Sequence, residues 1–193
     1  MKRVFMFLSR SGAGKGTQAD FLRKHFGEEY TLYISTGDRM RALAKSDTVA
    51  GVYMQKVMES GERGPAFSAI WVWADEMITH VTGKIETVIF EGAPRTIVEA
   101  RALDEAFVFF EIERVYPLWL DITQEEARKR LTGRNRFDDN PAAIERRLAF
   151  YERDVVPVLR YYQGESRYQL VRIDGMPSPE EVFEQIKRVL SSA

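Results

Sequence analysis

Two hydrophobic patterns alternate along the chain: short continuous apolar runs, and longer stretches with apolar residues at helical spacing. The runs predict five strands, at residues 4–8, 30–35, 87–90, 114–121 and 168–173. The longer stretches predict helices between and after them, at residues 17–26, 39–45, 49–60, 67–81, 97–107, 123–131, 140–162 and from 178 onward. Strands that alternate with helices in this way predict an α/β fold, with a central five-stranded parallel sheet covered by helices on both faces.

Two prolines fall inside predicted elements. Pro117 lies in the fourth apolar run, and because proline cannot donate a ladder hydrogen bond, this strand is expected near a sheet edge. Pro157 lies in the long helix predicted after Asn140 and is expected to kink or divide it.

The composition favours one globular domain and excludes several kinds of site. The chain has 193 residues, of which 45% are hydrophobic, enough to fill a single core. Its 28 basic and 29 acidic residues nearly cancel, so no overall charge favours nucleic acid or a membrane surface. The lack of cysteine excludes disulfides and cysteine-ligated zinc. No apolar run could span a bilayer, and residues 4–8 are too few for a signal peptide, so the cytoplasm is the expected location.

A glycine-rich segment directly follows the first predicted strand. Gly12, Gly14 and Gly16 let the backbone curl and direct its N–H groups toward a common centre. The segment leads into a helix N-terminus, which favours anions, and Lys15 adds a positive charge for the outer phosphates of a nucleotide. These features predict a phosphate-binding loop. The alternative is an ordinary glycine-rich turn with a solvated lysine.

Polar segments follow four of the predicted strands. They read Gly-Ala-Gly-Lys, Ser-Thr-Gly-Asp, Glu-Gly-Ala-Pro-Arg and Asp174-Gly175. Ligands of parallel sheets bind outside the carboxyl ends of the strands, so these segments are expected to meet on one rim. The rim would then combine a phosphate loop with acids and an arginine. A phosphate site alone does not separate a kinase from a switch or a motor.

Arginines are frequent near the predicted loop ends. The candidates are Arg41, Arg95, Arg130, Arg134, Arg136 and Arg147. Phosphoryl transfer requires alignment of two substrates and neutralisation of spread negative charge, and the planar guanidinium grips phosphate oxygens in a bidentate way. The alternative is that these arginines are solvated charges paired with neighbouring acids. Beside a phosphate loop, the phosphate-binding interpretation is the stronger one.

Several motifs together resemble those of a known family. In order, they are Gly12-Ala-Gly-Lys-Gly-Thr-Gln18, Ser35-Thr-Gly-Asp38 with Arg41, Gly92 with Pro94-Arg-Thr96, Arg130-Leu-x-x-Arg134-x-Arg136-x-Asp138-Asp139, and Arg147-Leu148. The chain resembles the adenylate kinases and their nucleoside monophosphate kinase relatives over nearly its full length. This resemblance implies a three-layer P-loop fold with a small helical insert for the monophosphate and a short lid.

The resemblance also implies roles for individual residues. The ATP-binding residues would be Gly12, Ala13, Gly14, Lys15, Gly16, Thr17, Arg130 and Arg134. The residues that bind the monophosphate would be Thr36, Gly37, Arg41, Gly92, Arg95, Glu99, Arg136 and Arg147. The catalytic residues would be Lys15, Arg95, Arg130, Arg134, Arg136 and Arg147. Asp38 and Glu91 would hold Mg²⁺ through its waters.

Two mobile parts within the single domain 1–193 are implied as well. Residues 37–66 would form a flap over the acceptor nucleotide, and residues 131–139 a short lid. Their closure would exclude water, which otherwise competes as phosphoryl acceptor. No general base is expected, because a nucleotide phosphate is already ionised at neutral pH. The expected partners are small nucleotides (ATP and a nucleoside monophosphate), and the protein is expected to be a monomer.

Three positions depart from the family pattern. Ser9 replaces the first loop glycine, and Glu91 stands where an aspartate is usual. Glu99 stands where adenylate kinases carry a glutamine. A glutamine amide both donates to adenine N1 and accepts from its N6 amino group, whereas a carboxylate only accepts and suits guanine better. Against this, Thr36 and its neighbours are typical of members that accept AMP, and Glu99 could instead point to solvent.

The favoured function is a Mg²⁺-dependent, reversible kinase that transfers the γ-phosphoryl group of ATP to a nucleoside monophosphate, with AMP ahead of the others. The alternatives are the same chemistry on GMP, CMP, UMP or a deoxynucleotide, a small-metabolite kinase on the same scaffold, and a nucleotide-binding switch without transferase activity. A switch has no need to surround a second phosphate with arginines, so the arginines argue against it.

Overall fold

A parallel sheet forms the centre of the molecule. The computed structural model describes residues 2–133 and 140–191. Its five strands are β1 (Arg3–Leu8), β2 (Thr31–Ser35), β3 (Thr87–Glu91), β4 (Arg114–Asp121) and β5 (Val171–Asp174). They pair in parallel in the order β2-β3-β1-β4-β5. The predicted five-stranded parallel sheet is thus confirmed.

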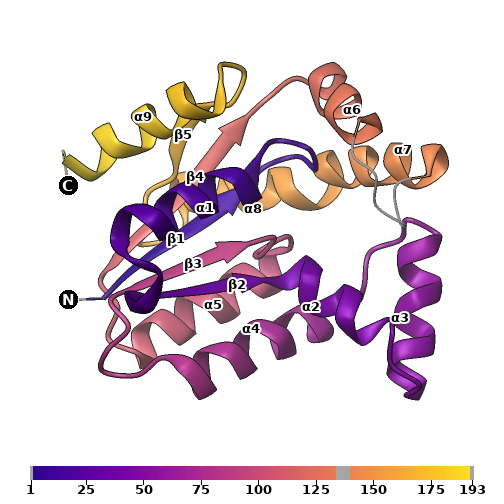
Figure 1. Ribbon diagram of the computed structural model, residues 1–193, viewed down its shortest axis with the longest axis horizontal. Helices are drawn as coiled ribbons and strands as arrows, with labels where there is room; N and C mark the ends of the chain where they lie inside the picture. Colours follow the sequence, from indigo (N-terminus) through magenta and orange to yellow (C-terminus); the bar gives the residue numbers. More distant parts are fainter. Residues whose placement is uncertain (1, 134–139, 192–193) are drawn as a thin grey trace.

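Helices cover both faces of this sheet (Figure 1). They are α1 (Lys15–Phe26), α2 (Thr36–Leu43), α3 (Val49–Glu59), α4 (Ala66–His80), α5 (Ile97–Phe109), α6 (Gln124–Thr132), α7 (Pro141–Phe150), α8 (Val156–Gly164) and α9 (Pro179–Ser191). Helices α4, α5 and α8 pack on one face, and α1, α6, α7 and α9 on the other. Helices α2 and α3 project beyond the sheet in Figure 1. None of the helices in the described part of the chain is long and apolar enough to cross a membrane.

The central strand β1 is buried on both sides. Val4, Met6 and Leu8 belong to the core on the α4–α5–α8 face, and Phe5 and Phe7 to the core on the opposite face. Side chains alternate between the two faces of a strand, so a continuous apolar run is what a strand between two helical layers requires. This burial fixes the direction of β1 and the position of the loop that follows it.

The two prolines interrupt their elements in different ways. Pro117 lies opposite Met6 of β1, and pairing of β4 with the edge strand β5 begins only at Leu118. Strand β4 is therefore next to the sheet edge, as expected. The long helix predicted after Asn140 is divided into α7 and α8 by a π-helical turn, Tyr151–Val155. Proline at position 157 supplies no N–H and crowds the carbonyl four residues earlier. This explains why the helical hydrogen bonds change from the α to the π pattern just before it.

Two boundaries differ from the sequence prediction by three residues. Helix α2 begins three residues earlier than expected, because the Ser35 hydroxyl accepts a hydrogen bond from the Asp38 N–H (3.3 Å) and caps it. Strand β5 begins at Val171 rather than at Tyr168. The Tyr168 ring instead packs edge-on against Phe107, at a centroid distance of 5.8 Å.

Candidate functional site

A cleft of about 630 Å³ opens at the carboxyl ends of the strands. Its walls come from the loop after β1, the start of α2, the loop after β3 and the end of α7. The predicted site residues that line it are Gly12, Gly14, Lys15, Gly16, Thr17, Thr36, Gly37, Asp38, Arg41, Glu91, Gly92, Arg95, Glu99, Arg130 and Arg147. The structure therefore brings together nearly all of the predicted site residues that it describes. Ala13 is buried in the core beneath the loop, and Arg134 and Arg136 lie outside the described residues.

The loop after β1 has the backbone of a phosphate-binding loop. Gly12 and Gly14 both have φ of +87°, a conformation that side chains disfavour. A Cβ atom on Gly12 would also lie only 2.8 Å from the Ala127 carbonyl oxygen of α6. Gly14 occupies the N-cap of α1 without a side-chain cap, and residues 14–17 at this helix N-terminus line the cleft, where an anion would be favoured.

Lys15 is held at the base of the loop. Its Nζ donates to the Arg10 carbonyl (3.0 Å) and to the Ser9 hydroxyl (3.2 Å). Ser9 also donates to the Arg10 carbonyl (3.1 Å). The serine that replaces the first loop glycine thus provides a hydrogen bond that orients the lysine.

The start of α2 forms the opposite wall. Thr36 is buried, and its hydroxyl oxygen has no hydrogen-bond partner within the described part of the chain. Because buried hydroxyls are normally paired, this atom is a candidate to contact a ligand. The Arg41 guanidinium lies over Gly37 and is paired with the Asp38 carboxylate.

Arg95 follows β3 and is partly buried against Gly92. Gly92 has φ of +94°, and a Cβ there would lie 2.7 Å from Nη2 of Arg95. Burial lowers the pKa of the Arg95 guanidinium, and the Glu99 and Glu91 carboxylates oppose that shift. Arg63 and Arg41 lower the same pKa further through charge repulsion. This wall of the cleft thus concentrates positive charge.

Glu99 does not point to solvent. Only 3% of its surface is exposed, and it lies in the first turn of α5. Its Oε2 accepts from the Arg95 N–H (2.9 Å) and its Oε1 from the Thr96 hydroxyl (3.1 Å). The Glu99 N–H in turn donates to the Thr96 hydroxyl oxygen (3.2 Å), so Thr96 and Glu99 together form a reciprocal cap at the N-terminus of α5. The carboxylate therefore caps α5 while also lining the cleft.

Two further arginines border the cleft on the side of α6 and α7. Arg130 donates through Nε to Glu126 (2.7 Å) and through Nη2 to the Gly175 carbonyl (3.2 Å). The first bond holds the pKa of the Glu126 carboxyl below its usual value. A second cavity, of about 270 Å³, lies between Arg130, Gly14, Gly175 and the start of α9. Arg147 lines the main cleft and donates through Nε to the Ala143 carbonyl (3.4 Å).

The proposed magnesium residues lie in the cleft but do not form a ligand cluster. Glu91 accepts bonds from the Ser35 hydroxyl (2.8 Å) and the Tyr33 hydroxyl (3.4 Å), both at Oε2. Burial and the Glu91 charge raise the pKa of Tyr33, so its hydroxyl remains a donor. Within residues 2–133 and 140–191, no group of three or more His, Asp or Glu side chains could hold a metal ion by itself.

Sequence reasoning missed two arginines of this cleft, Arg10 and Arg63. Arg10 lies 3.8 Å above the Tyr151 ring and donates to Glu152 (2.8 Å). Its Nε and Nη1 are buried without a partner in the described residues. An arginine between two serines inside a phosphate loop was a visible signal. Arg63 had no comparable signal, because its partners are distant in sequence.

The chain is similar to known proteins over nearly its whole length. The family model described as "Adenylate kinase" matches residues 7–167. The chain belongs to the adenylate kinase family. It is 35% identical to an adenylate kinase of Leptospira biflexa over 96% of this chain and 98% of the relative. It is 33% identical to an adenylate kinase of Thermus thermophilus, over 97% of each chain. UMP-CMP kinase 3 of Arabidopsis thaliana is also 33% identical, over 97% of this chain and 89% of the relative.

Membership in the adenylate kinase family confirms the predicted fold and class of chemistry. The chain is a phosphotransferase of the nucleoside monophosphate kinase type, and its family uses ATP as the phosphoryl donor. The interpretation as a switch without transferase activity is therefore not supported. The arrangement is suited to this chemistry, because a phosphate loop and several arginines face one cleft.

Proposed function

We propose that this adenylate kinase family member transfers the γ-phosphoryl group of ATP to AMP and forms two molecules of ADP, reversibly. The observation that carries the proposal is that one and the same cleft has Lys15 on one wall and Arg41 and Arg95 on another. Two polyanions can meet end to end only where positive groups compensate both of them. Positioning and electrostatic stabilisation then supply most of the catalysis, since the protein has little covalent chemistry to perform.

The donor lies along the phosphate loop in this proposal. Lys15 and the amides at the start of α1 bind the outer phosphates of ATP, and the donor base lies against Arg130 in the cavity beside Gly175. Arg147 faces the transferred group from α7. Arg134 and Arg136 complete this set in the proposal, although they lie outside the described residues.

The acceptor lies between α2 and the loop after β3. Arg41 and Arg95 bind its phosphate, and Thr36 and Glu99 lie beside its base. Binding of the monophosphate replaces Asp38 as the partner of Arg41, because a dianion competes with the exposed carboxylate. The buried Thr36 hydroxyl supports a polar contact with the nucleotide. The Glu99 carboxylate keeps a second candidate open, GMP, since it accepts from guanine N1–H and N2 but donates to nothing.

Magnesium fits the cleft if it is held largely by water and phosphate. Mg²⁺ keeps much of its hydration shell and is usually bound through one or two carboxylates together with substrate phosphates. Asp38, Glu91 and Thr17 line the cleft, and their side-chain oxygens would hold its waters. When bound, the ion neutralises charge on the phosphates.

Closure completes the site in this proposal. Residues 37–66, which include α3 and all of α2 except its first residue, move over the acceptor. Residues 131–139 act as a short lid, although Leu131 and Thr132 end α6 and residues 134–139 are outside the described range. Closure excludes water and so favours transfer over hydrolysis. We propose further that the enzyme acts as a monomer in the cytoplasm.

A coupled assay tests the proposal. ADP formation from ATP and Mg²⁺ is measured with AMP, GMP, CMP, UMP and their deoxy forms, and without any acceptor. The expected result is ADP formation that requires a monophosphate and is fastest with AMP. ADP formation that is independent of an added monophosphate would overturn it. Glu99→Gln is expected to raise kcat/KM for AMP relative to GMP, and an unchanged ratio would mean that Glu99 does not contact the base.

A further inference from the structure

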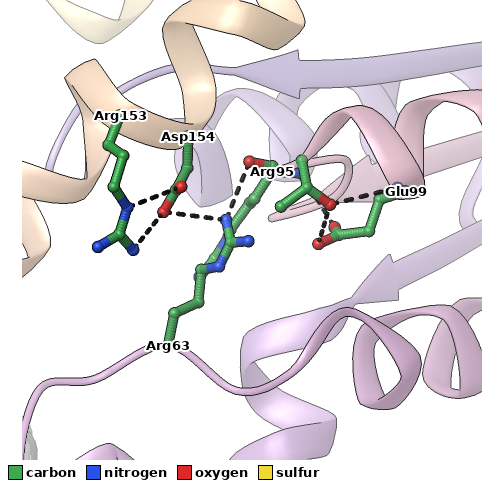
Figure 2. Close-up of polar contacts among 6 residues, drawn as sticks. Arg63, Arg95, Glu99, Arg153 and Asp154 are labelled. Atoms are coloured by element: carbon green, nitrogen blue, oxygen red, sulfur yellow. Dashed lines mark hydrogen bonds and ion pairs between the residues drawn. The ribbon is translucent and has the colours of Figure 1, made fainter.

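Arg63 joins three segments that are far apart in sequence. It lies in the connection between α3 and α4, lines the cleft, and has a side chain only 18% exposed. Its Nη1 donates to the main-chain carbonyl of Arg95 (2.9 Å) and is 3.5 Å from Oδ2 of Asp154 in the π-helical turn. Figure 2 shows the guanidinium between the Arg95 loop and the turn that carries Asp154.

Asp154 has a second partner of a different kind. Arg153 donates to both Asp154 oxygens, at 3.0 and 2.9 Å, but its side chain is 66% exposed, and its guanidinium lies on the opposite side of the Asp154 carboxylate from Arg63 (Figure 2). The Asp154 side chain is itself only 14% exposed. Asp154 thus has one solvent-exposed partner and one partner inside the cleft, and only the latter reaches the Arg95 loop.

The connection that carries Arg63 is also packed tightly against α7. A Cβ on Gly61 would lie 2.5 Å from the Ala143 Cα. The Asn140 side-chain amide donates to the Glu59 carbonyl at the end of α3 (3.2 Å). These contacts place the end of residues 37–66, the proposed flap over the acceptor, beside α7, which bears Arg147. Arg63 is the residue of this connection whose side chain is hydrogen-bonded to the Arg95 main chain.

We propose that Arg63 and Asp154 are positioning residues for acceptor binding: Arg63 holds the Arg95 main chain, and Asp154 holds Arg63. The inference rests on the proposed function, in which Arg95 binds the phosphate of the monophosphate. Arg95 is oriented on its other side by Gly92 and Glu99. The Arg63 bond fixes the carbonyl of the same residue, so the guanidinium is presented to the cleft from a fixed backbone.

A positioning role for Asp154 and a purely electrostatic role predict opposite effects of its removal on binding of the monophosphate. A carboxylate close to the binding site of a dianion repels it, so removing that charge should strengthen binding of the monophosphate. If Arg63 bound the acceptor phosphate directly, releasing it from Asp154 would also strengthen binding. If Asp154 instead keeps Arg63 on the Arg95 carbonyl, removing its charge weakens binding. The sign of the change therefore distinguishes the mechanisms.

The test compares the full-length wild-type enzyme with three single substitutions in the same chain. Arg63→Gln removes the bond to Arg95, Asp154→Asn removes the charge that holds Arg63, and Arg153→Gln removes the exposed partner of the same carboxylate as the control. The KM for AMP, the KM for ATP, kcat and the melting temperature are measured for each. If the wild-type enzyme prefers another monophosphate to AMP, the KM for that monophosphate is measured in place of the KM for AMP.

We expect Arg63→Gln to raise the KM for the monophosphate about tenfold, the effect of one hydrogen bond to a charged group. Asp154→Asn raises it about two- to fivefold, because it acts through a partly exposed ion pair. The KM for ATP changes less than twofold in both variants, and Arg153→Gln changes neither constant. A fourth variant combines Arg63→Gln with Asp154→Asn, and its KM for the monophosphate is expected to equal that of Arg63→Gln alone, because Asp154 acts only through Arg63.

Three results would overturn the inference. They are a lower KM for the monophosphate in Asp154→Asn, a melting temperature that falls in Arg63→Gln while both KM values stay at the wild-type level, and an equal rise of KM in Arg153→Gln. Each of these leaves the activity of the wild-type enzyme intact. Failure of the inference is therefore distinguishable from failure of the proposed function, which would appear as a wild-type protein that makes no ADP from a monophosphate.

Discussion

Gly92→Ala should disturb the proposed acceptor site by displacing the Arg95 guanidinium. Gly92 has φ of +94°, and the new Cβ would lie 2.7 Å from Nη2 of Arg95. The clash is with the end of a flexible side chain, so the fold can accommodate it by moving that guanidinium. The guanidinium is the group proposed to bind the monophosphate, and its displacement should be visible in the binding of that substrate.

Two magnitudes follow from this geometry. The positive φ costs about 1–2 kcal/mol for a residue with a side chain, which corresponds to a fall in melting temperature of about 2–8 °C for a chain of this size. Displacement of an arginine from a phosphate loses about 1.5–3 kcal/mol of binding, or roughly a 10- to 100-fold rise in the KM for the monophosphate. The KM for ATP should change less than twofold.

Gly27→Ala is the matched control. Gly27 has φ of +87°, and its added Cβ would meet the Tyr30 ring at 3.0 Å. It follows the last residue of the 12-residue helix α1, about 18 Å from the phosphate loop. Both variants should lose similar stability in thermal melts, and only Gly92→Ala should alter the KM for the monophosphate in the coupled assay. Similar melting temperatures with an unchanged KM in Gly92→Ala would refute the role assigned to Arg95.

Three further predictions concern single groups. The Asp104 carboxylate accepts hydrogen bonds from the Tyr161 hydroxyl (2.8 Å), the Tyr162 hydroxyl (3.0 Å) and the Ser166 hydroxyl (2.8 Å), so Asp104→Ala should lower the unfolding free energy in urea by about 3 kcal/mol, with KM values unchanged. Burial and Asp104 raise the pKa of Tyr161 from 10.0 to about 12. The folded state therefore favours the protonated hydroxyl, and this contribution to stability is complete below pH about 10 and is lost as the pH rises toward about 12. A urea midpoint that stays constant over that pH range would contradict this prediction. Thr36→Val removes a buried hydroxyl that has no partner within the described part of the chain, so it should raise the KM for the monophosphate without loss of melting temperature; a fall in melting temperature with an unchanged KM would show that the hydroxyl has a structural role.

The sequence was sufficient for the features that depend on local patterns. The continuous apolar run of β1 and the glycines after it predicted a buried strand and a phosphate loop, because both the run and the backbone conformations are encoded residue by residue. Ser35 carried a usable signal too. A serine three residues before Asp38 is a typical helix cap. The start of α2 was nevertheless predicted too late, because Gly37 interrupts the helical pattern.

Contacts between distant segments were not predictable in this way. Arg63 and Asp154 are separated by 91 positions and Arg10 and Glu152 by 142, and neither pair leaves a periodic trace in one sequence. The proline at position 157 predicted an interruption of the long helix, but not that a π-helical turn would form there or that Asp154 in this turn would pair with Arg63. Such pairings depend on packing between elements, which a single sequence does not encode locally.

The central claim is that donor and acceptor nucleotides meet end to end in one cleft. A crystal structure with two adenosines joined by a chain of five phosphates tests it most directly. We expect one end of the phosphate chain on Lys15 and the amides of α1, and the other on Arg41 and Arg95, with Arg147 between them. A phosphate chain that leaves the cleft, or that contacts Lys15 while Arg41 and Arg95 stay turned away, would contradict the account.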